Sequence, residues 1–219
     1  MCRFLLVRSQ KKVQPAKLLQ EFALMCEGSH APDGDWQGDG WGIAIQGKKW
    51  EVYKSLKPIW EESGKFQQFG ETDIFIVHAR SSGFSKHKGV LAYNQPYVRD
   101  CLAYVFNGMV RGVSLPMKLD GTIGAQKIFS LISDCVHDKA PDQLLPYVRE
   151  LIRKNARKVE GMNIGLALGD RLYALCDYED NADYFSLRYY ADEKFAMICS
   201  EPIGSYRWQV MKKGEALTL

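Results

Sequence analysis

Short runs of strand-forming residues, separated by turn residues, recur along almost the whole of this chain. The runs cover residues 2–8, 41–47, 51–55, 73–79, 101–106, 163–168, 171–176, 184–191, 194–200 and 207–213. In the last third of the sequence, short turn-forming segments such as Gly169-Asp170 separate each run from the next, and this pattern predicts an antiparallel meander. The two runs on either side of Lys48 and Lys49 predict a β-hairpin. A chain with this pattern builds its core largely from antiparallel sheets.

Apolar residues at helical spacing mark several segments between these runs. The predicted helices lie within 15–28, 124–136 and 141–157, and a weaker pattern predicts a short one within 58–70. Pro146 either kinks the third helix or marks its start. Strands at both ends with helices between them predict a mixed α+β fold. No break in composition marks a boundary, so we expect residues 1–219 to form a single domain.

Composition excludes several classes of protein. Of the 219 residues 46% are hydrophobic and 25% charged, which is typical of a globular chain and not of a disordered one. The net charge is only +3 and acids are interspersed with bases, so we expect no nucleic-acid partner. No apolar run approaches the roughly 18 residues of a membrane span. The apolar stretch from Phe4 to Val7 is too short for a secretory signal, so we expect a cytoplasmic protein.

The cysteines contain no Cys-x-x-Cys pair, which argues against zinc ribbons and a disulfide framework. Five lie in apolar patterns, where we expect them to pack in the core: Cys26, Cys101, Cys135, Cys176 and Cys199. Cys2 differs, because removal of Met1 would make it the first residue, and its small side chain permits that removal. A terminal cysteine supplies a thiol nucleophile and an α-amino group whose pKa of about 7.7–8.0 suits a general base. The alternative is a chance cysteine at the start of a buried strand.

Two further features allow both a chemical and a structural interpretation. Asn107-Gly108 follows a strand-forming run and is typical of a tight turn. An Asn side-chain amide and the next backbone N–H can instead form an oxyanion hole. Arg80, at the end of the run 73–79, is either a surface charge or a clamp for a substrate carboxylate. No histidines have metal-binding spacing, so we expect neither a metal nor another cofactor.

Several short motifs occur in an order and spacing that resemble the class II glutamine amidotransferase family, most closely its small stand-alone members. They are MCRF at residues 1–4, GDGWGIA at 38–44, HAR at 78–80, NQPYV at 94–98, FNG at 106–108 and SEPI at 200–203. The resemblance covers most of the sequence. It implies the fold of the N-terminal nucleophile hydrolases, an αββα sandwich of two antiparallel sheets between helix layers.

The resemblance also implies a role for each matching residue. Cys2 is the expected nucleophile, and its freed α-amino group the general base. Arg80 is expected to bind the α-carboxylate of glutamine, while the Asn107 side chain and the Gly108 N–H form the oxyanion hole. The implied reaction cleaves the side-chain amide of glutamine or a γ-glutamyl compound through a thioester, releasing ammonia or an amine. The ammonia is then lost, or used by a separate ammonia-accepting synthase. Arg3 either lowers the pKa of the Cys2 thiol or points into solvent.

The sequence departs from the family pattern in the segment before the second predicted helix. The family has an Asp there that binds the α-amino group of glutamine, and in this sequence Ile123 stands in its place. Asp120, three residues earlier, is an alternative partner if the loop takes another route. Two other functions therefore remain open. One is an amidase for another amide without a free α-amino group, and the other is a non-catalytic binding or regulatory module that retains the fold.

Overall fold

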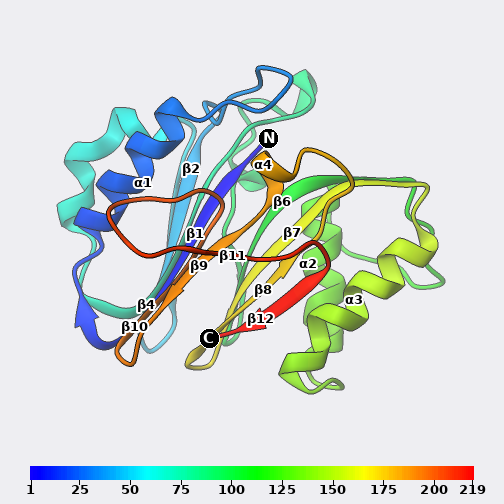
Figure 1. The fold of residues 1–219 in the computed structure, drawn as a ribbon. Coiled ribbons are helices and arrows are strands. Elements are labelled where there is room, and N and C mark those ends of the chain that lie inside the picture. The colour runs from blue at the N-terminus through cyan, green and yellow to red at the C-terminus, as the bar shows by residue number, and fades with distance from the viewer.

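The computed structural model describes residues 1–219 and consists of two antiparallel sheets that stack face to face, with helices on the outer faces (Figure 1). One sheet has seven strands in the order β11-β9-β10-β1-β4-β2-β3, and the other has five in the order β12-β8-β7-β6-β5. In Figure 1, α1 lies on the side of the seven-stranded sheet, and α2 and α3 lie on the side of the other. The predicted α+β class and its αββα arrangement are confirmed.

The elements follow one another along the sequence as a mixture of strands and short helices. The strands are β1 (Arg3–Val13), β2 (Trp41–Gln46), β3 (Trp50–Ser55), β4 (Thr72–Ala79), β5 (Tyr97–Arg99), β6 (Leu102–Arg111), β7 (Lys158–Leu168), β8 (Arg171–Cys176), β9 (Arg188–Ala191), β10 (Phe195–Cys199), β11 (Gln209–Val210) and β12 (Glu215–Thr218). The α-helices are α1 (Ala16–Gly28), α2 (Gly124–Cys135), α3 (Pro141–Asn155) and α4 (Ala182–Phe185), and the 3-10 helices are η1 (Ile59–Gln68), η2 (Ser85–His87) and η3 (Leu91–Tyr93).

Three apolar layers hold the sandwich together. The first joins α1 and η1 to the seven-stranded sheet, the second lies between the sheets, and the third joins the five-stranded sheet to α2 and α3. Strand β1 contributes to two of them, because alternate side chains of a strand point to opposite faces. Leu5 and Val7 pack under α1, whereas Phe4 and Leu6 pack between the sheets. This double burial explains why the strand is a continuous apolar run in the sequence.

The structure changes two of the predicted elements. Strand β6 continues to Arg111, so Asn107 and Gly108 lie inside it, opposite Asn163 and Met162 of β7. The tight-turn interpretation of this pair is therefore wrong, because ladder pairing with β7 prevails over the local turn preference. The predicted strand over 184–191 is divided into α4 and β9. The break coincides with the left-handed conformation of Asn181, whose carbonyl oxygen accepts hydrogen bonds from the N–H groups of Tyr184 and Phe185, the last two residues of the short helix.

Other boundaries are shifted less. The third predicted helix begins at Pro141, so Pro146 lies inside α3 and does not mark its start. The hairpin of β2 and β3 is confirmed, with Gln46 opposite Trp50. Strand β12 is an addition that sequence reasoning did not predict. None of the helices is both long enough and apolar enough to span a bilayer.

Not all of the five cysteines that were expected in the core are buried. Cys26, Cys176 and Cys199 are buried, but Cys135 is half-buried and Cys101 is exposed. Cys101 occupies the turn between β5 and β6, next to Asp100 in a positive-φ conformation, so the apolar run that it opens begins one residue later. The prediction that all five pack in the core is wrong for Cys101.

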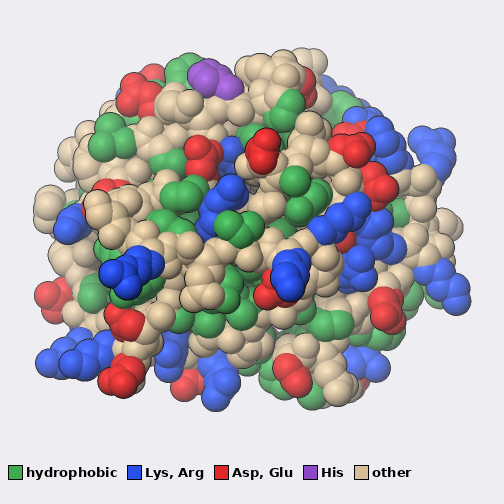
Figure 2. Space-filling model, viewed as in Figure 1, with side chains coloured by type: hydrophobic (Ala, Val, Ile, Leu, Met, Phe, Trp, Pro, Cys, Tyr) green, Lys and Arg blue, Asp and Glu red, His purple; other side chains and the backbone are tan.

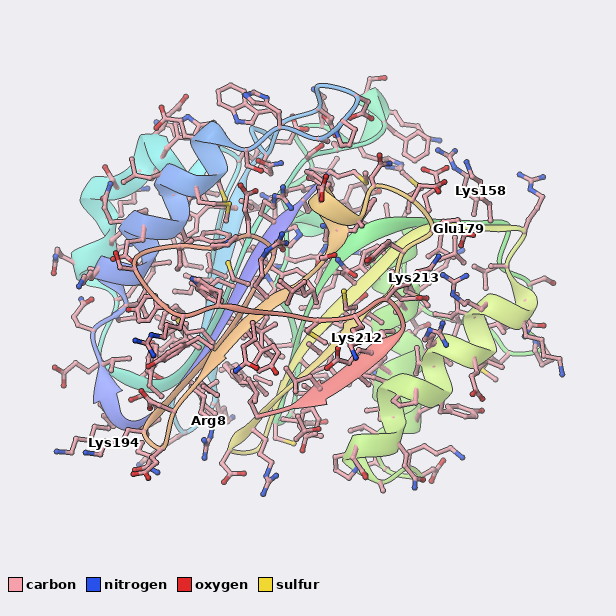
Figure 3. The ribbon with its side chains drawn as sticks, in the orientation of Figure 1. Arg8, Lys158, Glu179, Lys194, Lys212 and Lys213 are labelled. Atoms are coloured by element: carbon pink, nitrogen blue, oxygen red, sulfur yellow. The ribbon has the colours of Figure 1, made fainter.

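Charged side chains of both signs are interspersed over the face of the molecule in Figure 2. Several are paired at one end of β7 and β8, where Figure 3 places Lys158, Glu179 and Lys213 near one another. The Lys213 Nζ lies 3.8 Å from Glu179 Oε2, and Arg153 Nη1 lies 3.4 Å from the same oxygen. These exposed pairs carry little stability individually.

Candidate active site

Cys2 precedes β1, the middle strand of the seven-stranded sheet. Its Sγ accepts a hydrogen bond from the Ser81 backbone N–H at 3.4 Å and lies 3.5 Å from the Ser81 carbonyl oxygen. Burial raises the pKa of the Cys2 thiol, although the terminal amine, the Ser81 N–H and Arg80 act in the opposite direction. With Met1 attached, the thiol is therefore protonated at neutral pH.

Met1 is held at both ends by side chains that sequence reasoning did not single out. Its amine pairs with Asp35, whose carboxylate also accepts a hydrogen bond from the Ser81 hydroxyl. Its carbonyl oxygen accepts hydrogen bonds from Gln37 Nε2 at 2.8 Å and from the Tyr184 hydroxyl at 2.9 Å. Burial raises the pKa of Asp35, but the bonds from the amine and the hydroxyl outweigh it and leave that pKa below its usual value. The only feature of the sequence that could have pointed to Asp35 and Gln37 is the long turn-rich loop in which they lie.

Asn107 lies fully buried in β6 beside the backbone of Cys2. Its Oδ1 accepts a hydrogen bond from the Cys2 N–H at 3.1 Å, whereas its Nδ2 has no partner. This single bond fixes which end of the amide faces the cysteine nitrogen. A buried donor without a partner is costly, so the Asn107 amide nitrogen is an unusual group in this strand.

Gly108 follows Asn107 in β6, where the backbone of the neighbouring strand β7 lies very close. A Cβ atom at this position would collide with the carbonyl oxygen of Gly161. Only glycine therefore fits at this point of the strand pair. Gly108 lines the same cavity as Cys2, so its small size also keeps the backbone accessible beside the sulfur.

Arg80 directly follows β4 and is only 5% exposed. Its guanidinium donates to three neutral oxygens, Asn94 Oδ1 at 3.2 Å, Ser82 Oγ at 3.3 Å and the His87 carbonyl at 2.8 Å. No Asp or Glu pairs with it. A buried guanidinium without an acidic partner is unfavourable unless an anion joins it, so the surroundings of Arg80 favour a negatively charged ligand.

The motif around residue 94 positions both Arg80 and the strand that carries Asn107. Asn94 accepts from the Arg80 guanidinium and donates through Nδ2 to the Ser55 carbonyl at 2.6 Å. Gln95 accepts from the Phe106 N–H at 2.6 Å and donates to the carbonyl oxygen of the same residue at 3.3 Å. The backbone immediately before Asn107 is thus fixed by a side chain from another segment.

The motif near the C-terminus holds the start of β1 in a similar way. Ser200 Oγ accepts a hydrogen bond from the Phe4 N–H at 3.0 Å. Glu201 lies 2.8 Å from Arg3 Nη2, and Arg3 also donates to Ser29 Oγ at 2.9 Å. Arg3 is therefore buried and forms an ion pair with Glu201. It does not point into solvent, so that alternative is wrong, whereas a lowering of the pKa of the Cys2 thiol by Arg3 stays a prediction.

Cys2, Arg80 and Gly108 line one cavity of about 280 Å³, with Ile123 at the start of α2 on its wall. Asn107 adjoins it through its contact with Cys2. The four residues that the sequence analysis placed at the site therefore come together, although they are spread from the first strand to the sixth. Asp120 is exposed and does not line the cavity.

Comparisons with known proteins bear on the fold. Neither a protein-family model nor a curated protein matches this sequence. Among solved structures, the protein is similar to a glutamine aminotransferase class-II domain protein from Silicibacter pomeroyi, with a TM-score of 0.65 and 15% identity over 99% of this chain and 94% of that one. This protein has the class II glutamine amidotransferase fold.

Two further structures share that fold. A predicted glutamine amidotransferase from Pseudomonas aeruginosa has a TM-score of 0.60 and 15% identity over 99% of this chain and 96% of that one. The glutamine phosphoribosylpyrophosphate amidotransferase from B. subtilis has a TM-score of 0.70 and 13% identity over 99% of this chain, which corresponds to 47% of the other.

Proposed function

We propose that this protein is a cysteine amidohydrolase that cleaves the side-chain amide of glutamine or a γ-glutamyl compound. The observation that carries the proposal is a cavity lined by two unusual groups and adjoined by a third. These are the sulfur of the second residue, a buried Asn107 amide without a partner for its nitrogen, and a buried Arg80 without an acidic partner.

The first step of the proposed mechanism depends on removal of Met1, which turns the backbone nitrogen of Cys2 into an α-amine. An N–H of that nitrogen already donates to Asn107 Oδ1, which would hold the amine in place beside its own side chain. The amine then takes the thiol proton, and the thiolate attacks the amide carbon of the substrate. Because the pKa of an α-amine lies near neutrality, the amine can both accept this proton and return it to the leaving group.

The oxyanion that forms carries a full negative charge and needs donors that are already in place. The Asn107 Nδ2 group is free for this because its Oδ1 is committed to Cys2. The Gly108 N–H is the second proposed donor. When the intermediate collapses, the C–N bond breaks, ammonia leaves with the proton from the amine, and a thioester to Cys2 remains. Water, deprotonated by the same amine, hydrolyses the thioester to a carboxylic acid and the free thiol.

Arg80 supplies the proposed binding energy for the other end of the substrate. Its planar guanidinium suits a carboxylate, which it can bind through two parallel hydrogen bonds. Fixing the carboxylate determines the direction of the substrate and so the position of its side-chain amide relative to Cys2. The neutral oxygens around Arg80 hold the guanidinium without competing for its charge.

Ammonia release by protein of verified mass tests the proposal. Intact-mass measurement first identifies the species without Met1, and that species should release ammonia from glutamine or from an amide derived from it. Cys2→Ala should abolish the release while leaving the fold intact. Cys101→Ala, which removes an exposed cysteine in a turn, is the matched control and should retain full activity. Absence of ammonia release from glutamine and from every amide derived from it would contradict the proposal.

The contacts of Met1 favour a competing function, a non-catalytic module in which Met1 stays attached. Asp35, Gln37 and Tyr184 together bind its amine and its carbonyl oxygen. An attached Met1 denies the site its α-amine, and with it the general base. Protein isolated from cells that carries Met1 throughout, and that releases no ammonia, would establish this alternative in place of the enzyme.

A further inference from the structure

A second cavity opens directly beside the one that contains Cys2. Its volume is about 500 Å³, compared with about 280 Å³ for the first. The two share part of their walls, namely Val110, Thr122, Gly124 and Ile128. The two cavities therefore adjoin each other at the start of α2, one beside the sulfur of Cys2 and the other beside the segment between β6 and α2. The combined size is that of a pocket for a substrate larger than glutamine.

Most of the residues that line the second cavity are apolar. Its wall is built chiefly by side chains of the segment that follows β6 and by α2, including Val113, Leu115, Met117, Leu119, Ile128 and Leu131. Its single charged residue is Lys127. Val113 is 40% exposed and Met117 is 44% exposed. A ligand in the cavity would cover both of these apolar side chains. A lining of mainly apolar residues, with exposed large side chains next to a polar site, is typical of a subsite for an apolar group.

The cavity that contains Cys2 is lined by cationic side chains but by no anionic one. No Asp or Glu lines it, and its charged lining residues are the two cations Arg80 and Arg111. The carboxylate of Asp35 is bonded to Ser81 and the terminal amine, and Asp35 does not line the cavity. Ile123 occupies the wall where this cavity meets the second one. An ammonium group here would lose its water and gain no counter-charge, which is unfavourable.

From this combination we propose that the physiological substrate is a carboxylate-bearing side-chain amide whose α-nitrogen carries an apolar acyl group. The inference rests on the proposed function. The carboxylate binds Arg80, the acylated nitrogen is neutral and passes Ile123, and the acyl tail fills the second cavity. Only the C–N bond of the side-chain amide is broken. Water supplies the hydroxyl group of the new carboxylic acid and a proton of the released ammonia, and the acyl group stays on the α-nitrogen.

A series of three substrates separates this inference from the proposed function. Ammonia release is measured for L-glutamine, Nα-acetyl-L-glutamine and Nα-octanoyl-L-glutamine with protein that lacks Met1. We expect kcat/KM to rise along the series, by at least about tenfold from acetyl to octanoyl, because the longer acyl group buries more apolar surface. Activity that is highest on free glutamine, or that does not change with acyl length, would overturn the substrate class while supporting the amidohydrolase. Absence of activity on all three would refute the amidohydrolase itself.

Two substitutions locate the effect in the structure. Val113→Glu places a charge in the second cavity and should remove most of the preference for octanoyl over acetyl. Val52→Glu is the matched control, because Val52 is also 40% exposed but lies on β3 and lines neither cavity, so the preference should persist. Ile123→Asp adds a counter-charge and should shift selectivity toward free glutamine by at least about tenfold. An unchanged preference in both Val113→Glu and Ile123→Asp would contradict the inference.

Discussion

Two asparagines that face each other across β6 and β7 allow activity and stability to be separated. Asn107 and Asn163 are opposite each other in the register of the strands, and both are fully buried. Asn163 uses both ends of its amide, since Nδ2 donates to the Phe185 carbonyl at 2.5 Å and Oδ1 accepts from the Asp177 N–H at 2.9 Å. Asn107 uses only Oδ1, which accepts from Cys2.

The expected magnitudes follow from these bonds. Asn163→Ala leaves the buried Asp177 N–H unpaired and the Phe185 carbonyl with only a weak bond from Cys176 Sγ, at about 1–3 kcal/mol each, so the free energy of unfolding should fall by roughly 2–6 kcal/mol. Asn107→Ala removes one bond and should cost about 1–3 kcal/mol. Loss of an oxyanion donor lowers kcat by about 100- to 1000-fold, which is the loss expected for Asn107→Ala. Asn163→Ala, while folded, should keep kcat within about threefold of the parent.

Urea unfolding and ammonia-release kinetics on the same preparations provide both measurements. Circular dichroism first establishes a temperature at which each variant is folded, and kcat is then compared at that temperature. The expected pattern is a crossed one, with the larger stability loss at Asn163 and the larger activity loss at Asn107. If folded Asn107→Ala retains kcat within about threefold, the oxyanion role is wrong.

Three further predictions test other parts of the structure. Arg80→Met should raise KM for carboxylate-bearing amides by about 10- to 100-fold in ammonia-release kinetics, and should affect an amide without a carboxylate much less. Gly108→Ala should lower the free energy of unfolding by more than about 2 kcal/mol in urea, because its Cβ would collide with the Gly161 carbonyl. Gly28→Ala, whose Cβ would meet nothing within 4 Å, should change it by less than about 0.5 kcal/mol. Burial lowers the pKa of His78 to about 3, so the unfolded protein binds a proton below about pH 6.5 that the folded protein does not. Stability should therefore fall as the pH drops from about 6.5 toward 3, by up to about 1.4 kcal/mol per pH unit, and His78→Asn should flatten that part of a urea-derived profile.

The class of fold was predictable because strand and helix periods are local properties of the sequence. The order of strands was not, because β1 pairs with β4 and with β10, which lies almost at the other end of the sequence. Local signals also misled where a distant partner prevails. The Asn107-Gly108 dipeptide favours a turn when taken alone, yet pairing with Asn163 and Met162 keeps it in an extended strand.

The site shows the same division between local and distant information. Cys2, Arg80 and Asn107 stand in short motifs, so a sequence can indicate them one at a time. The residues that bind Met1 cannot be found in this way, because Tyr184, for example, is 183 positions away from Met1 in the sequence. The role of Glu201 in binding Arg3 is likewise a contact between residues near the two termini. Such partners become visible only when the sheets bring the segments together.

Asp35 gives a last prediction, for the protein after removal of Met1. In the structure its carboxylate holds the amine of Met1 and the hydroxyl of Ser81, while the Ser81 N–H contacts the sulfur of Cys2. Without Met1, the new amine is that of Cys2, one residue further along. For an assumed separation of about 6 Å and an effective dielectric constant of about 20–40, the attraction is about 1.4–2.8 kcal/mol, which raises the pKa of the amine by about one to two units.

Removing this charge should therefore act on the general base and not on the fold. Asp35→Asn should lower the pKa of the Cys2 amine and move the acidic limb of the kcat/KM profile to lower pH by about one unit or more. Asp73→Asn, which removes an exposed carboxylate on β4, should leave the limb in place. A limb that stays in place in Asp35→Asn would mean that the group titrating there is not the α-amine beside Asp35. The assignment of general base to that amine would then fail, even if Cys2 proved essential.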